Sequence, residues 1–93
     1  MEHDDVLRIV NHFRNGNAQT FTSHDFINQF VYHYHEQYQH LLLRYNGNKR
    51  ITHSVIANYL RYHAEDLGIT RNLHRTKTFN VTGNMSDSRL WNH

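Results

Sequence analysis

Apolar residues recur at intervals of three and four along much of the chain, which is the period of an amphipathic helix. This spacing predicts a first helix over Asp4 to Asn15, buried through Val6, Ile9, Val10 and Phe13. A second helical region runs to Tyr45 after Thr22, whose hydroxyl lies three residues before Asp25, the spacing of a capping box. Periodicity alone allows one helix over residues 23–45, but poor helix formers predict a bend or break near His33 to Glu36.

The stretch from Ile51 to Ile69 predicts a third helix that has signals at both ends. Thr52 has a hydroxyl that can accept a free backbone N–H of the first turn, so we expect it to be the N-cap. Gly68 fits the left-handed residue that follows a helix. The buried side is predicted to hold Ile56, Tyr59, Leu60, His63, Ala64 and Leu67. The opposite side carries Ser54, Ala57, Asn58, Arg61 and Tyr62.

Short extended segments complete the pattern. Thr20-Phe21 is expected to add a few residues to a small sheet, and Asn46-Gly47-Asn48 predicts a turn between helices. After Gly68, the residues Thr78, Asn80 and Thr82 alternate with Phe79 and Val81, which predicts a strand with one buried face. A turn at Gly83-Asn84 then leads to a returning strand over Ser88 to His93. We expect Phe79 and Trp91 to pack from this hairpin onto the helices.

Composition narrows the class of protein. Ninety-three residues predict a single domain over residues 1–93 with a modest core. The chain has no cysteine, which removes disulfides, thiolate catalysis and cysteine-based zinc sites. No apolar run reaches the length of a membrane span, and the N-terminal sequence does not have the pattern of a signal peptide. We therefore expect a cytoplasmic protein with no membrane partner.

Charge is distributed unevenly along the sequence. Residues 1–46 hold three arginines against five acidic residues, whereas residues 47–93 hold seven cationic residues against three acidic ones. Clustered cations favour nucleic acid as a partner, because neutralising phosphates releases counterions. The competing interpretation is an ordinary solvated surface, since the net charge is only +2.

The predicted order of elements is helix, short strand, helix, helix-turn-helix and a C-terminal β-hairpin. This mainly helical α+β arrangement, with three to four helices, resembles the winged helix-turn-helix DNA-binding domain. The resemblance covers Asp4 to Trp91 and rests on element order. It implies that the helix over residues 52–67 lies in the major groove of double-stranded DNA and that the hairpin over residues 70–92 contacts the backbone as a wing. The protein would then be a transcriptional regulator or accessory factor.

Carried over residue by residue, the resemblance places a set of residues on DNA, most of them polar or cationic. On the recognition helix and just before it these are Lys49, Arg50, His53, Ser54, Ala57, Asn58 and Arg61. The wing cations are Arg71, Arg75 and Lys77. Asn can pair with adenine and Arg with guanine in a bidentate manner. The alternative is that the fold serves protein association or homodimerisation without DNA, with Tyr32 and Leu43 as exposed apolar contacts, because a fold does not fix a function.

Ten histidines also raise the question of a metal site. His33, Glu36 and His40 have the i, i+3, i+7 spacing of one helix face, and imidazole with carboxylate suits zinc. No standard ligand spacing is present, however, so we interpret these histidines as solvated side chains and predict no metal or other cofactor. The sequence has no nucleophile–base spacing and no Gly-rich phosphate loop, and we predict that the protein is not an enzyme.

Overall fold

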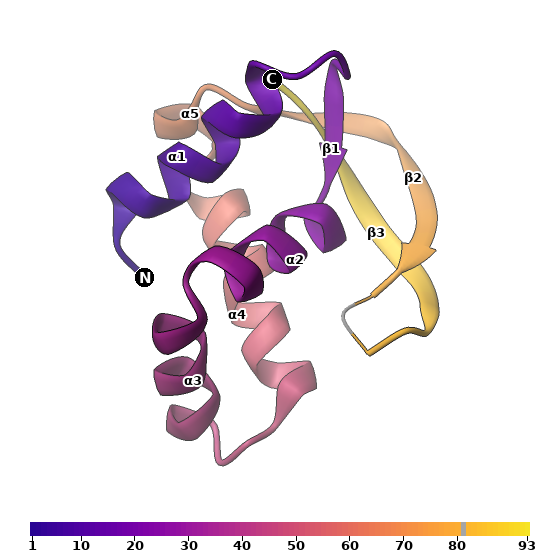
Figure 1. The fold of residues 1–93 in the computed structure, drawn as a ribbon. Coiled ribbons are helices and arrows are strands. Elements are labelled where there is room, and N and C mark those ends of the chain that lie inside the picture. Colours follow the sequence, from indigo (N-terminus) through magenta and orange to yellow (C-terminus); the bar gives the residue numbers. More distant parts are fainter. Residues whose placement is uncertain (81) are drawn as a thin grey trace.

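The computed structural model describes residues 1–80 and 82–93, apart from the side chain of Arg75, and places the helices to one side of a small antiparallel sheet (Figure 1). The helices are α1 (His3–Arg14), α2 (Ser23–His33), α3 (His35–Arg44), α4 (Lys49–Tyr62) and the short α5 (Ala64–Leu67). The strands are β1 (Thr20–Thr22), β2 (Thr70–Phe79) and β3 (Met85–Asn92). The chain therefore has an α+β fold, as predicted.

The start of α2 and the break after it agree with the sequence. The backbone N–H of Asp25 donates to the Thr22 hydroxyl at 3.0 Å, and the Thr22 N–H donates to the Asp25 carboxylate at 3.0 Å, which confirms the capping box. Tyr34 leaves the helical conformation, with φ −127° and ψ 47°, and separates α2 from α3. The predicted break near His33 to Glu36 is therefore confirmed.

The predicted N-terminus of the third helix is wrong by one turn. Asn48 is the N-cap of α4, since its side-chain oxygen accepts the N–H of Ile51 at 3.0 Å. Thr52 lies inside the helix, fully buried, and its hydroxyl donates to the Asn48 carbonyl at 2.8 Å. The helix also ends earlier than predicted, because His63 interrupts it before α5.

The left-handed residue after this helical region is confirmed. Gly68 has a φ of 69° and ends α5. The guanidinium of Arg14, at the end of α1, donates to the Leu67 carbonyl at 2.9 Å and to the Gly68 carbonyl at 3.3 Å. Backbone carbonyls that a helix leaves unpaired at its end are thus satisfied by a side chain from the first helix.

The sheet has the strand order β1-β3-β2, so the last strand in sequence lies in the middle. Phe21 is opposite Trp91 across β1 and β3, and Phe79 is opposite Met85 where β2 meets the hairpin turn. Gly83, with a φ of 85°, supports that turn, as predicted. The pairing of β2 with β3 is irregular between Arg71 and Arg75. There the Asn72 side chain donates across the sheet to the Asn92 carboxamide at 2.9 Å and accepts the N–H of His74 at 2.9 Å.

The core lies between the helices and the sheet. Its buried apolar residues are Val6, Ile9, Val10, Phe21, Phe26, Ile27, Phe30, Tyr38, Leu41, Ile56, Leu60, Leu67, Ile69 and Trp91. Trp91 is only 2% exposed, as predicted, and its indole N–H donates to the Ser23 hydroxyl at 3.1 Å. Burial of aromatic residues of this size is a major source of stability in a small domain.

The prediction that Phe79 packs onto the helices is wrong, because its side chain is 65% exposed. Side chains alternate between the two faces of a strand. The neighbouring Thr78 is the residue that faces the helices, where it contacts His24 at the start of α2. Val81, which the sequence predicts on the same strand face as Phe79, lies outside the described residues.

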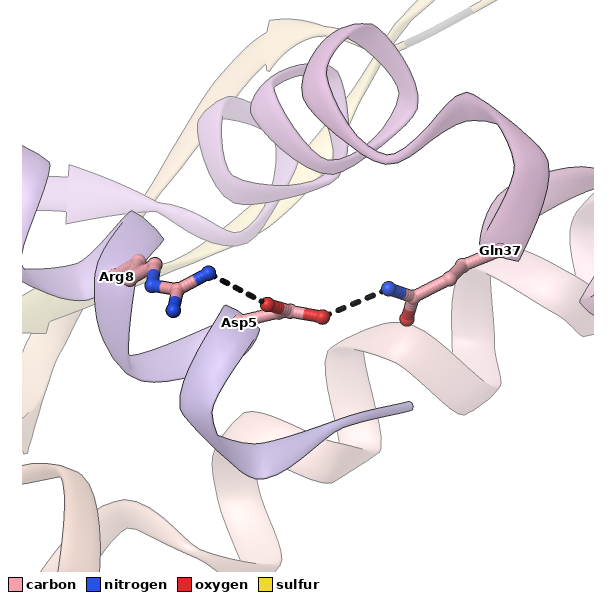
Figure 2. Close-up of polar contacts among 3 residues, drawn as sticks. All are labelled: Asp5, Arg8 and Gln37. Atoms are coloured by element: carbon pink, nitrogen blue, oxygen red, sulfur yellow. Dashed lines mark hydrogen bonds and ion pairs between the residues drawn. The ribbon is translucent and has the colours of Figure 1, made fainter.

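A carboxylate joins the first and third helices. Asp5 of α1 accepts a hydrogen bond from Arg8 at 3.1 Å through one oxygen and from Gln37 of α3 at 2.7 Å through the other (Figure 2). The Asp5 side chain is only 15% exposed, whereas the Arg8 side chain is 72% exposed. The carboxylate is therefore better shielded from water than the guanidinium. The bond to Gln37 joins α3 to α1, and α3 also contacts α4.

Candidate functional site

A groove with a volume of about 550 Å³ lies between α4 and the hairpin that β2 and β3 form. One wall comes from α4. The residues of α4 that line it are Lys49, Arg50, His53, Ser54, Ala57, Asn58 and Arg61. These are the same seven residues of this region that the sequence singled out, so the structure brings them together on one surface.

The helix presents this wall because its other side is committed to the core. Thr52, Ile56 and Leu60 are fully buried, and they follow one another at a spacing of four residues. Residues at such spacing share one face of a helix. The polar residues between them therefore lie on the opposite side and face the groove.

The second wall contains residues that the sequence analysis did not identify. From α2 and its start come Ser23, His24 and Ile27, and from the hairpin come Asn80, Thr82, Ser86, Asp87, Ser88 and Arg89. The hydroxyl groups could have been anticipated, since Ser86 and Ser88 alternate along one face of a strand. Their position opposite α4 is a tertiary feature that no local pattern contains.

Two of the three predicted wing cations, Arg71 and Lys77, are not part of this lining. Arg71 and Lys77 are exposed on β2 and do not line the groove. Lys77 is opposite Asp87 in the register, where cross-strand side chains of opposite charge attract each other. Arg75 is paired with Arg89 along the strands, and its side chain lies outside the described part of the structure. Among the described side chains, the hairpin side of the groove contributes the cation Arg89 and the carboxylate Asp87.

Hydroxyl groups of the hairpin surround the half-buried ring of His24. Its Nδ1 lies 2.6 Å from the Thr78 hydroxyl, and its Nε2 lies 3.3 Å from the Ser86 hydroxyl. The backbone N–H of His24 donates to the Ser88 hydroxyl at 3.1 Å. Burial lowers the pKa of His24 below its usual value, against the opposing effects of Thr78 and Asp25. These contacts attach α2 to both strands of the hairpin.

His53 is the second histidine that lines the groove, and it belongs to α4. Its Nε2 lies 2.8 Å from the hydroxyl of Tyr38, a buried residue of α3, and the two rings are 5.7 Å apart between centroids. Burial lowers the pKa of His53, and the charges of Lys49 and His24 lower it further. Burial also raises the pKa of the Tyr38 phenol. Tyr38 therefore stays protonated near neutral pH and available as a hydrogen-bond donor or acceptor.

The groove is positively charged on balance. Lys49, Arg50, Arg61 and Arg89 contribute four cations, and Asp87 is the single carboxylate among the lining residues that the structure describes. The remaining lining groups are mostly hydroxyls, amides and imidazoles, which can donate or accept hydrogen bonds. This combination is chemically suited to an anionic, polar ligand.

The structure separates the three residues considered as metal ligands. His33 ends α2, whereas Glu36 and His40 belong to α3 beyond the break at Tyr34. Within residues 1–80 and 82–93, no group of three His, Asp or Glu side chains is placed to hold a metal ion.

None of the helices in the described residues is long and apolar enough to span a membrane. Comparison of the chain with protein-family models, with curated proteins and with solved structures finds no match. The site therefore has to be interpreted from its own chemistry.

Proposed function

We propose that this chain is a small double-stranded DNA-binding domain of the winged helix-turn-helix type, acting as a transcriptional regulator or accessory factor. The observation that carries the proposal is the groove that collects seven residues of α4, six of them polar or cationic, opposite the hairpin. A cationic surface with hydrogen-bonding side chains is what phosphate contact and base readout both require.

The arrangement of elements supports the same proposal. In the winged-helix family, a short strand follows the first helix, and a two-stranded hairpin follows the second helix of the helix-turn-helix. Here α3 and α4 are joined by a turn in which Asn46 and Gly47 have positive φ, and β2 and β3 pair with β1 in the order β1-β3-β2. The hairpin lies beside α4, as Figure 1 shows.

In this proposal α4 enters the major groove, which at about 12 Å in width admits one α-helix. Asn58 and Arg61, both exposed, are the base-reading residues. Lys49 and Arg50 at the N-terminal end of α4 contact phosphates. The groove between α4 and the hairpin then receives the sugar–phosphate strand that borders the major groove.

The test is a salt titration of binding to a random-sequence duplex, followed by fluorescence anisotropy. Each phosphate contact should contribute about −0.9 to the slope of log K against log salt. Lys49→Ala should flatten the slope by about that amount on every sequence. Arg44→Ala is the matched control, since Arg44 is an exposed cation on α3 that lines a different hollow. We expect the control to keep the parent slope.

Sequence readout needs a second measurement, made after a preferred site has been selected from a random pool. Arg61→Ala should cost about 1–3 kcal/mol on the preferred site and little elsewhere. If the parent does not bind duplex DNA at low salt and micromolar protein, the proposal is wrong.

Exposed apolar side chains favour one alternative, which is association with a second copy or another protein. On α4, Ile51 is 46% exposed and Tyr62 is 75% exposed, and both lie outside the groove lining. Tyr32 and Leu43, the two residues suggested by the sequence, are 80% and 72% exposed on α2 and α3. Sedimentation velocity over a range of concentrations tests self-association, and Tyr62→Ser should lower the dimer fraction if α4 forms the contact.

A further inference from the structure

The two histidines of the groove come from different helices and face a common space. His24 is at the start of α2 and His53 is in α4, and each lines the groove. The charge on one ring influences the pKa of the other. The two rings therefore lie on the same cationic groove, and a positive charge on His24 lowers the pKa of His53.

Both rings have hydroxyl partners that fit either protonation state. A hydroxyl can donate to an unprotonated ring nitrogen or accept from a protonated one. The hydroxyls of Thr78 and Ser86 are such partners for His24, and the hydroxyl of Tyr38 is such a partner for His53. A proton can therefore be added to each ring without breaking a hydrogen bond, and only the local charge and the burial oppose it.

In the free protein, burial and nearby cations both oppose protonation. The charged groups around the pair are Lys49, Arg50, Arg61 and Arg89, which repel an imidazolium, and Asp87 and Asp25, which attract it. Burial lowers the pKa of both histidines, and Lys49 adds to this effect at His53. Near neutral pH the two rings are therefore predominantly neutral.

An anion in the groove reverses the balance. A negative charge close to a histidine favours its protonated form. A phosphodiester keeps its own negative charge throughout the range in which histidine titrates, so a change of affinity with pH reports on the protein. The ligand and the protons then stabilise each other in the same space.

We propose that the groove binds the phosphodiester backbone of one DNA strand with uptake of protons at His24 and His53. This proposal rests on the proposed function and specifies how that function is regulated. The two histidines add positive charge only when the strand is present, so DNA affinity should increase as the pH falls through the histidine range.

The first test measures the affinity for a short duplex from about pH 8 to about pH 6 at constant ionic strength, since histidine titrates within this range. For each proton taken up on binding, the association constant should increase by up to about tenfold for every unit by which the pH is lowered. His24→Gln and His53→Gln should each reduce the dependence on pH. His74→Gln is the matched control, because His74 is exposed on β2 and does not line the groove. The control should keep the parent profile.

The second test needs no variant. Calorimetric titration of the parent with the duplex in two buffers of different ionisation enthalpy counts the protons taken up per complex. We expect net uptake near pH 7 that decreases as the pH is raised. An absence of proton uptake in this measurement refutes the proposal even where a histidine variant fails to fold, and the variants assign any uptake to His24 and His53.

The outcomes separate this proposal from the one on which it rests. If the parent binds no duplex at any pH, DNA binding itself is refuted. If the parent binds but its affinity is independent of pH and no protons are taken up, the proton-coupled groove is refuted and DNA binding stands. The same conclusion follows if the dependence on pH persists unchanged in both groove variants.

Discussion

Replacement of Trp91 by Ala tests the packing between the sheet and the helices. Trp91 lies on the central strand β3 and is 2% exposed. It is opposite Phe21 in the register, and its indole N–H is bonded to the Ser23 hydroxyl at the start of α2. One side chain thus joins the edge strand β1 and the helix α2 to the middle strand of the sheet.

The expected loss is large compared with the stability of a domain of this size. Truncation of a buried Trp to Ala generally costs about 3–5 kcal/mol. A domain of 93 residues has a free energy of unfolding of about 5–14 kcal/mol. Trp91→Phe keeps most of the apolar ring but leaves the Ser23 hydroxyl without this partner, which should cost about 1–3 kcal/mol.

The assay is urea denaturation followed by far-ultraviolet circular dichroism. Fluorescence cannot compare the variants, because Trp91 is the only tryptophan in the chain. A double-mutant cycle with Ser23→Ala and Trp91→Phe isolates the hydrogen bond, and residues in direct contact typically couple by about 0.5–3 kcal/mol.

Tyr62→Ala is the control for a large exposed ring, since Tyr62 is 75% exposed on α4. We expect this control to change the free energy of unfolding by less than about 0.5 kcal/mol. The packing argument is refuted if Trp91→Ala is no more destabilising than the Tyr62 control. A coupling energy near zero in the cycle would instead remove the hydrogen bond from the account while leaving the packing intact.

Three further predictions concern local features. Asn48→Ala should cost about 0.5–2 kcal/mol in urea denaturation as the loss of a helix cap, and an unchanged midpoint would place the cap elsewhere. Gly68→Ala should lower the melting temperature more than Gly47→Ala: both residues have positive φ, but only at Gly68 would the added methyl meet a guanidinium nitrogen, at 3.1 Å. Burial lowers the pKa of His53 in the folded protein below the ordinary histidine pKa of 6.5. As the pH falls below 6.5, the unfolded chain therefore binds more protons than the folded protein, and the free energy of unfolding decreases. The loss should be smaller in His53→Gln, and equal acid sensitivity of the two proteins in pH-dependent melting would contradict this account.

Local rules were sufficient where the deciding atoms are close in sequence. The capping box of Thr22 and Asp25 is a contact between residues three apart, and the left-handed Gly68 follows from the conformational freedom of glycine. The helix start at Asn48 was missed although it obeys the same rule. Both Asn48 and Thr52 can cap a helix, and they lie one turn apart. The choice between them is made by the core, which encloses Thr52 completely.

The sequence predicted the α4 wall of the groove but not the hairpin wall. Helical periodicity placed Ser54, Ala57, Asn58, Arg61 and Tyr62 on the outer side of this helix, and all of these except Tyr62 line the groove. Lys49, Arg50 and His53, which the family resemblance added, line it as well. The hairpin wall depends on which face of each strand turns inward. Alternation allowed either Phe79 or Thr78 to face the helices, and hydrophobicity favoured Phe79. The polar N-terminal turn of α2 reversed this choice, because His24 is placed to contact Thr78.

The irregular pairing of β2 has a consequence for behaviour at high concentration. β2 is at the edge of the sheet, and edge strands can pair with other chains and lead to aggregation. Between Arg71 and Arg75 the strand departs from regular pairing, and the Asn72 carboxamide holds this distortion by bonds to Asn92 and to the His74 N–H. Further along the same edge is the exposed Lys77. Distortion and charge together make the edge a poor template for a flat intermolecular sheet, so the protein keeps a ten-residue strand at its surface without offering a continuous site for fibril growth.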